Sequence, residues 1–156
     1  MGTANAIVPL GPSYLELMWI VDQDEAAQSL FGRLVAERRG FVGWCVRTDD
    51  LDAACVRLGL EAHPASRVRP DGVALRWRLA GVEEAIAQPG VPFFIEWDVP
   101  PEAHPGRAGP SQGELVAVES PADLGEWLGG AELPIRHGPG GVAVRRPGST
   151  LIEWIR

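Results

Sequence analysis

Val91-Pro92-Phe93-Phe94-Ile95-Glu96-Trp97-Asp98 is a run of strand-forming residues with one carboxylate near its centre. Related runs lie near the start of the chain, at 14–19, and at its end, at 150–155. Each run combines apolar residues, one Glu and a nearby Trp, and the β-branched and aromatic residues among them favour a strand. A strand that recurs with one acid in each copy predicts a repeated module with one functional position per module.

Side chains in a strand alternate between its two faces, so the central run has two distinct sides. One side is expected to pack against a helix and carries Phe93, Ile95 and Trp97. The other side is expected to line a cleft and carries Phe94, Glu96 and Asp98. The alternation therefore predicts that Glu96 faces a ligand.

Length and composition set the class of protein. The chain has 156 residues, of which 46% are hydrophobic, which suits one compact domain or two small repeated units that share a core. It has no apolar run of membrane-spanning length and no basic segment followed by an apolar stretch at its start, so we expect no membrane span and no signal peptide. The net charge of −7 argues against a nucleic-acid partner. A cytoplasmic protein is predicted.

Cys45 and Cys55 are the only cysteines, and they lie in different candidate elements without CxxC spacing. Two buried free thiols are typical of a protein in a reducing compartment. The sequence therefore predicts neither a disulfide nor a thiolate metal site.

Turn residues and hydrophobic periodicity divide the chain into elements. Three helices are expected: one capped by Asp22 with Glu25 that runs to Arg39, one capped by Asp49 or Asp50 that ends at Gly59, and one capped by Ser120. One or two helical turns are expected at 82–88. The Pro- and Gly-rich segment 99–112 is expected to be a linker or a mobile loop. Strands are expected at 3–10, 14–20, 41–48, 62–69, 73–79, 91–98, 114–119, 133–136, 142–145 and 150–155, with Pro70-Asp71-Gly72 as a turn.

The order of these elements repeats along the chain. Residues 41–98 and residues 113–156 each read as strand, helix and three strands, and residues 3–20 supply two further strands. We interpret the whole chain, 1–156, as a single domain with one partial module, 3–20, and two full modules.

A repeated β-α-β-β-β unit whose last strand carries a Glu resembles the vicinal oxygen chelate superfamily, and within it the glyoxalase-like domain group of bacterial proteins. The resemblance implies an α+β fold in which the modules form a curved, open, barrel-like mixed sheet with helices on its outer face. It also implies a small ligand or a divalent metal on the inner face. The residues that carry it are Gly2-Thr3-Ala4-Asn5-Ala6, Tyr14-Leu15-Glu16-Leu17, Gly43-Trp44, Arg47-Thr48-Asp49-Asp50-Leu51, Arg69-Pro70-Asp71-Gly72, Leu75-Arg76-Trp77, Pro92–Trp97 and His104-Pro105.

The resemblance implies a metal held by a His on the first strand and a Glu on the last strand of each module. The Glu positions are filled by Glu16, Glu96 and Glu153, which are therefore the candidate ligands of one divalent metal ion. The first-strand His is absent, because its places fall near Gly43 or Trp44 and near Glu114 or Leu115. In the first module, the chain is expected to start after that strand. Three explanations are open: the chain is shortened, its start codon was assigned too far downstream, or a partner subunit completes the sheet.

Glu96 is the leading candidate for a general base, since proton abstraction next to a carbonyl needs a carboxylate in a partly apolar cleft. Phe94 would supply the apolar wall of that cleft, and His104 would fold over it from the following loop. The alternative is that each glutamate is solvated or paired with a neighbouring arginine such as Arg76, Arg78 or Arg145.

Arg76 and Arg78 are the candidate contacts for an anionic small molecule, because a guanidinium binds a carboxylate with two hydrogen bonds. Asn5, in the Gly-Thr-x-Asn segment that carries the resemblance, is a further candidate ligand-binding residue.

Two functions remain open. The first is a glyoxalase-like enzyme of the lyase or isomerase type, with or without a divalent metal. The second is a non-catalytic protein that binds and sequesters a small ligand; the missing histidines favour the second and the three glutamates favour the first. A homodimer is also expected, because an open sheet edge invites a second chain to pair with it.

Overall fold

The computed structural model describes residues 2–69 and 71–156, so Met1 and Pro70 of the predicted 70–72 turn lie outside the described residues. The chain forms two compact units. Unit 1 contains the segment up to Val42 together with Pro105–Glu119 and Pro134–Arg156, and unit 2 contains Gly43–His104 and Ser120–Leu133. The predicted α+β class is confirmed: helices and mixed sheets occur together, and the sheets do not close into a barrel in the described chain.

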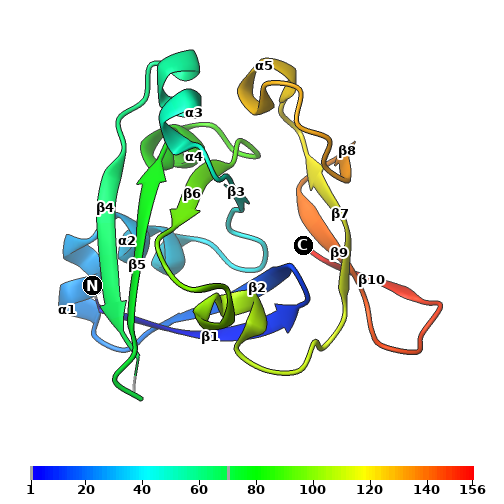
Figure 1. Cartoon of the computed structure of the whole chain (residues 1–156), viewed down its shortest axis with the longest axis horizontal. Coiled ribbons are helices and arrows are strands. Elements are labelled where there is room, and N and C mark those ends of the chain that lie inside the picture. Colours follow the sequence, from blue (N-terminus) through cyan, green and yellow to red (C-terminus); the bar gives the residue numbers. More distant parts are fainter. Residues whose placement is uncertain (1, 70) are drawn as a thin grey trace. The chain divides into compact units, whose positions relative to one another are not determined.

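Unit 2 is built around a four-stranded sheet in the order β3-β6-β5-β4, drawn in cyan and green in Figure 1. β3 runs parallel to β6, and the other neighbours are antiparallel. The first and last of these strands in the chain, β3 and β6, therefore pair at one edge of the sheet. From its start to β6, unit 2 contains β3 (Cys45–Arg47), α3 (Leu51–Leu58), β4 (His63–Val68), β5 (Ala74–Ala80), α4 (Val82–Ala87) and β6 (Phe93–Trp97).

The helix α3 begins and ends where its sequence predicts. The Asp50 carboxylate accepts a hydrogen bond from the backbone N–H of Ala53 at 2.9 Å, and Gly59 ends the helix in the left-handed region at φ 68°. Leu51 and Ala54 of α3 are buried with Ala80 and Phe94 in one hydrophobic cluster. The core of unit 2 thus lies between α3 and the β5–β6 pair.

That core shows that α3 covers the opposite face of β6 from the one that the sequence predicted. Phe94 packs under α3, and Glu96, on the same face, accepts a hydrogen bond from the N–H of Leu51, the first residue of α3. The prediction that Phe93, Ile95 and Trp97 face the helix is therefore wrong for α3, which covers the face of Phe94 and Glu96. Glu96 nevertheless also lines an open hollow of unit 2, as predicted. Ile95 is as well buried as Phe94, so hydrophobicity alone does not show which face the helix covers.

The predicted helix after Ser120 is shorter than expected. Ser120 ends strand β7 (Glu114–Ser120), and α5 is confined to Gly125–Leu128. The Ser120 hydroxyl donates to the Gly90 carbonyl at 2.9 Å and accepts from the N–H of Ala122, so it stabilises a turn before the helix. Trp127 anchors α5: its ring stacks on Phe94 with centroids 5.9 Å apart, and its indole N–H donates to the Pro92 carbonyl at 2.8 Å.

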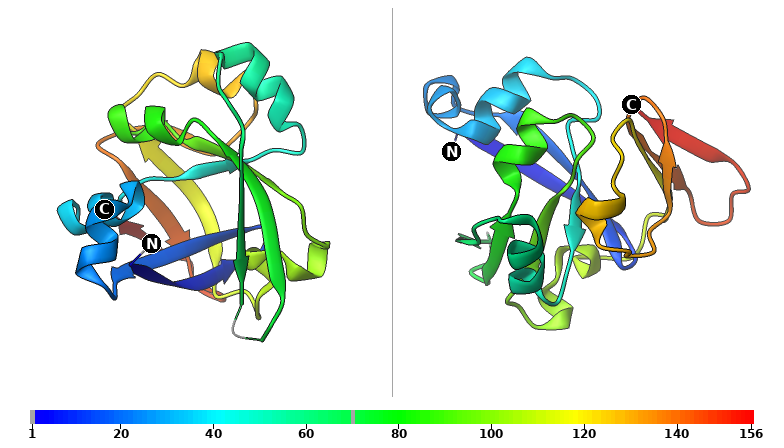
Figure 2. Two further views of the ribbon diagram at one scale, coloured as in Figure 1. Left: turned by 90° about the vertical axis from the view of Figure 1, so that its left-hand side faces the viewer. Right: turned by 90° about the horizontal axis from the view of Figure 1, so that it is seen from above.

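Unit 1 contains a two-stranded antiparallel sheet of β1 (Thr3–Leu10) and β2 (Ser13–Ile20). The helices α1 (Gln23–Gln28) and α2 (Leu30–Glu37) lie at the end of this hairpin where β2 finishes (Figure 2). One continuous helix was predicted here, and Ser29 divides it. Ser29 is extended, and its hydroxyl caps α2 by accepting from the N–H of Gly32 at 2.9 Å.

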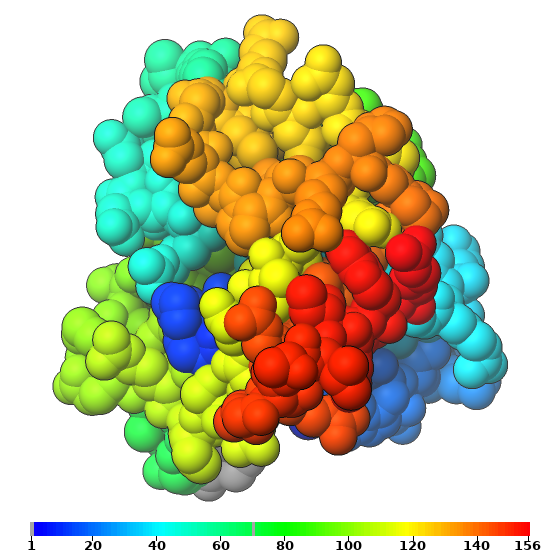
Figure 3. Space-filling view, turned by 90° about the vertical axis from the view of Figure 1, so that its right-hand side faces the viewer, coloured from blue at the N-terminus to red at the C-terminus, as the bar shows by residue number. Residues whose placement is uncertain are grey.

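The rest of unit 1 is a second four-stranded sheet, with β7, β8 (Ile135–His137), β9 (Gly141–Arg145) and β10 (Ile152–Ile155) in the order β10-β9-β7-β8. The β9–β10 hairpin, orange to red, forms part of the surface seen in Figure 3. Strand, helix and three strands thus follow one another here, whereas in 45–97 the additional helix α4 lies between β5 and β6. The pairing differs, because the first strand of this segment pairs antiparallel with the third, whereas β3 pairs parallel with the last strand of its segment.

The predicted linker carries two short 3-10 turns, Pro101–Ala103 and Pro105–Arg107. In the described parts of the chain, no helix is long and apolar enough to cross a membrane.

Candidate functional site

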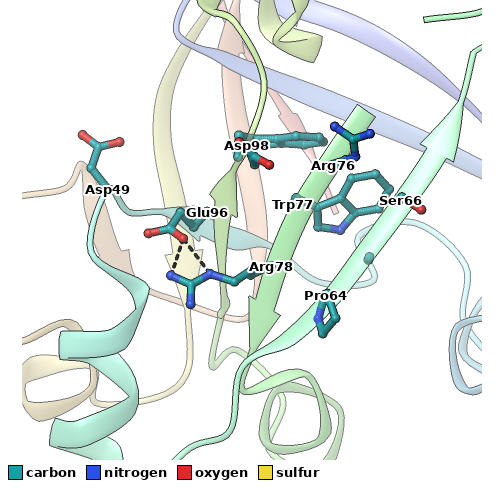
Figure 4. A pocket seen from close by; sticks show the side chains of 10 residues that line it. Asp49, Pro64, Ser66, Arg76, Trp77, Arg78, Glu96 and Asp98 are labelled. Atoms are coloured by element: carbon teal, nitrogen blue, oxygen red, sulfur yellow. Dashed lines mark hydrogen bonds and ion pairs between the residues drawn. The ribbon is translucent and has the colours of Figure 1, made fainter. Parts of the chain in front are cut away.

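The candidate site is an open hollow of about 850 Å³ on unit 2, lined by the strands β4, β5 and β6 and by the loop before α3 (Figure 4). Pairing in the sheet places its residues in rows. Pro64, Arg78 and Glu96 stand opposite one another, and Ala65, Trp77 and Trp97 form the next row. Arg76 pairs with Ser66, and the N–H of Asp98 donates to the Arg76 carbonyl at 3.0 Å, which makes the third row.

Glu96 and Arg78 form one side of the hollow and are fully engaged with each other. The Glu96 carboxylate accepts from Arg78 Nε at 2.8 Å and from Nη2 at 2.5 Å, and its second oxygen accepts from the N–H of Leu51 at 3.2 Å. Arg78 Nη1 also donates to Asp52 on α3 at 2.9 Å. Asp52 and Glu96 raise the pKa of the Arg78 guanidinium above its ordinary value through these hydrogen bonds. The network joins α3 to the sheet.

Arg76 and Asp98 form the other side of the hollow. In Figure 4 the Arg76 side chain points away from the Arg78–Glu96 pair, and no ion pair joins Arg76 to Asp98. Within residues 2–69 and 71–156, neither of these two side chains has a hydrogen bond or ion pair with another residue. The hollow therefore presents one available guanidinium, that of Arg76, and two available carboxylates, those of Asp98 and of Asp49 on the loop before α3.

Two tryptophans lie beside these charges. The Trp77 and Trp97 rings pack with centroids 5.1 Å apart, and the buried His104 ring meets Trp97 edge-on at 5.6 Å. His104 thus contacts the aromatic side of the hollow. The Trp97 indole N–H is buried without a hydrogen-bond partner in the described chain. A buried donor without an acceptor is unusual in a folded protein.

The remaining predicted site residues are distributed as follows. Phe94 is buried under α3 and stacks on Trp127, so its ring belongs to the core. In unit 1, the Asn5 amide donates to the Glu16 carboxylate across the β1–β2 hairpin. Glu153 on β10 accepts from Arg146 at 3.0 Å.

The three glutamates do not fit the predicted metal site. Glu16 is bonded to an amide, Glu96 to a guanidinium and a helix N–H, and Glu153 to a guanidinium. Hydrogen bonds usually orient a metal ligand through the atoms that the metal leaves free, whereas each of these carboxylates is held by a neighbouring donor. Outside Met1 and Pro70, no group of three or more His, Cys, Asp or Glu side chains is arranged to hold a metal ion.

Sequence reasoning missed Asp52, and it placed Asp98 on the cleft side of its strand without giving it a role. Asp52 follows the cap of α3 by two residues, which places it above Arg78 once the helix lies on the β5–β6 face. Asp98 follows Glu96 by two residues and shares its face. The spacing of both was visible in the sequence, but their importance depended on the face that α3 covers.

Unit 2 thus combines a four-stranded sheet of the α+β class with an open polar hollow. The chain belongs to the glyoxalase-like domain family, which matches residues 1–130, and so to the vicinal oxygen chelate superfamily. Comparison with the curated proteins found no match, and comparison with the solved structures found none either. The family match supports a small-molecule enzyme or binding protein of this superfamily.

Proposed function

We propose that the chain binds a small ligand with an anionic group in the unit 2 hollow and does not transform it. The observation that supports this choice is that Arg76 and Arg78, which both line the hollow, differ in their partners. Arg78 is bonded to Asp52 and Glu96, whereas Arg76 faces the same hollow without a partner in the described chain. Arg76 is therefore the group that would hold a carboxylate or phosphate.

The lyase or isomerase alternative depends on Glu96 as a base. To accept a proton from a substrate, Glu96 would have to release Arg78 and the N–H of Leu51. Breaking a partly buried pair of this kind leaves uncompensated charges, which is costly. This cost favours the binding function over catalysis at Glu96.

The metal-assisted form of that alternative has a direct test. Protein purified without an affinity tag is expected to contain no stoichiometric divalent metal and to bind none more tightly than about millimolar, the range of weak carboxylate sites. Elemental analysis and titration with Mn²⁺ and Zn²⁺ measure both. A tight site that is lost in Glu96→Gln would restore the metal enzyme and remove the present proposal.

Benzoate is a suitable probe of the binding function, because it combines a carboxylate with a flat apolar ring. Its binding can be followed by isothermal titration and by the fluorescence of the tryptophans in the hollow. Arg76→Ala is expected to weaken binding about tenfold, the value of one charge-assisted hydrogen bond. The matched control is Arg47→Ala. Arg47 is exposed on β3 outside the hollow, so this change removes the same charge without touching the site.

Equal affinity of the wild type and Arg76→Ala for benzoate would contradict the proposed site. So would a loss of the same size in Arg47→Ala, since it would trace to net charge alone. Failure of the probe to bind at about 10 mM would remove the function itself.

We also propose that two copies associate through β2. β2 pairs only with β1 in the described chain, and it carries Leu17 and Trp19 at 52% and 47% exposure. An antiparallel pair centred on Leu17 would place Glu16 opposite Met18 of the second copy, so no like charges would meet. Sedimentation should then show twice the 16.8 kDa chain mass, and a monomer at every concentration would remove the dimer.

A cytoplasmic location completes the proposal. Within the described chain neither Cys45 nor Cys55 is part of a disulfide, as is usual in a reducing compartment. Export to an oxidising compartment in the native host would contradict it, and cell fractionation with an antibody measures this directly.

A further inference from the structure

We infer that the ligand of the unit 2 hollow is a zwitterion: a small molecule with an anionic group for Arg76, a cationic group for Asp98 and an apolar part for the tryptophans. The inference rests on the proposed binding function and adds the chemical class of the ligand. It begins from the charges that line the hollow. Arg78 and Glu96 neutralise each other, and Asp52 holds the second side of Arg78. The Asp49 carboxylate also lines the hollow, on the side of Glu96 and away from Arg76 (Figure 4).

Arg76 and Asp98 are neighbours in the sheet. The N–H of Asp98 donates to the Arg76 carbonyl at 3.0 Å, one row beyond the Trp77–Trp97 pair. Both residues are two positions from the Arg78–Glu96 row, so their side chains emerge on the same face as that pair. Figure 4 shows both at this end of the hollow, with no bond drawn between them.

A purely anionic ligand meets opposing forces at this place. An anion that reaches Arg76 also approaches the Asp98 carboxylate, and it must approach a chain with a net charge of −7. At separations of a few ångströms the attraction and the repulsion are of similar size. A cationic group on the same ligand converts the repulsion by Asp98 into attraction, so the pair of residues selects for molecules that carry both charges.

The tryptophans support the same ligand class. Trp77 and Trp97 pack at 5.1 Å and both line the hollow, and their row lies between the two charged rows, so the hollow has an apolar part as well. An amino acid with an apolar side chain has all of these features.

Three probes of nearly equal shape separate the contributions: phenylalanine, which carries both charges, 3-phenylpropanoate, which is only anionic, and phenethylamine, which is only cationic. Titration followed by NMR shifts of the indole N–H groups gives the three affinities. Phenylalanine is expected to bind about fivefold more tightly than either analogue, the factor that one ion pair of modest strength provides.

Asp98→Asn then tests the assignment. It should remove the preference for phenylalanine over 3-phenylpropanoate, while leaving 3-phenylpropanoate at least as tightly bound as before. The variant should fold normally, because the Asp98 side chain makes no bond to other described residues. The control Glu83→Gln removes the same charge from exposed α4, outside the hollow, and should keep the preference.

The outcomes distinguish the two levels of the proposal. If 3-phenylpropanoate binds as tightly as phenylalanine, or if Asp98→Asn keeps the preference, the zwitterion inference fails while the anion-binding function stands. If Arg76→Ala leaves all three affinities unchanged, or if no probe binds at about 10 mM, both fail.

Discussion

The Glu96 carboxylate accepts two hydrogen bonds from the Arg78 guanidinium, at 2.8 Å from Nε and 2.5 Å from Nη2. Its other oxygen accepts from the N–H of Leu51 at the start of α3. With a side chain only 23% exposed, Glu96 is partly shielded from the solvent that weakens surface ion pairs. The acid at the centre of the chain's most distinctive strand therefore attaches a helix to the sheet.

Glu96→Gln is expected to lower the free energy of unfolding by about 1–2 kcal/mol, because the amide retains one acceptor but loses the charged pair. Urea unfolding followed by tryptophan fluorescence measures the loss. The control is Glu153→Gln, whose carboxylate pairs with Arg146 at 3.0 Å with a side chain 54% exposed. That change should cost less than about 0.5 kcal/mol. Similar losses in the two variants would contradict the structural role of Glu96.

The sequence predicted which residues of β6 share a face, since alternation follows from strand geometry alone. It could not predict which face α3 covers, because Phe94 and Ile95 are both buried. The decision came from contacts distant in sequence, such as Leu51 with Glu96. The interpretation of the candidate site changed for the same reason. Glu96, predicted to be a base, joins α3 to the sheet, and Arg76, with Asp98 beside it, is the guanidinium available to a ligand.

Helix boundaries were predictable where a side chain had only one backbone partner. Asp50 caps α3 as its position indicates. Ser29 and Ser120 behaved differently: Ser29 caps a second helix within one predicted helix, and Ser120 bonds to Gly90, 30 residues away. A serine is suited to a cap or to a turn, and tertiary contacts decide between them.

Trp127→Ala is expected to lower the unfolding free energy by about 3 kcal/mol, because it removes the ring stacked on Phe94 and leaves a cavity. Trp127→Phe keeps a ring and loses only the hydrogen bond to the Pro92 carbonyl, so about 1 kcal/mol should be lost. Chemical denaturation gives both values. If the alanine and phenylalanine variants were equally stable, the stacking would contribute nothing.

Cys55 is expected to react slowly with alkylating agents in the folded chain. Burial raises the pKa of its thiol above the ordinary value, and the nearby Asp52 carboxylate raises it further. At about pH 8 the folded chain should therefore hold less Cys55 thiolate than the chain unfolded in urea, and iodoacetamide should label it more slowly. Peptide mass spectrometry measures the rates.

The raised pKa of the Cys55 thiol also makes the stability of the fold depend on pH. A thiol pKa that is higher in the folded chain contributes stability below the unfolded value, and this contribution is lost as the pH rises through the folded value. Unfolding measurements should show the loss on the alkaline side only, and Cys55→Ala should remove it. Faster labelling of the folded chain would contradict both expectations.

Leu17→Lys is expected to convert the proposed dimer into a monomer. In an antiparallel pair of β2 strands centred on Leu17, the two lysines would stand directly opposite each other and repel. Val56→Lys is the matched control, because Val56 is 85% exposed on α3 and the change adds the same charge elsewhere. Sedimentation of both variants measures the effect. Mixing Leu17→Lys with Leu17→Glu should restore a dimer, since the facing charges are then opposite. If the mixture stays monomeric while the wild type dimerises, the two copies do not meet at Leu17.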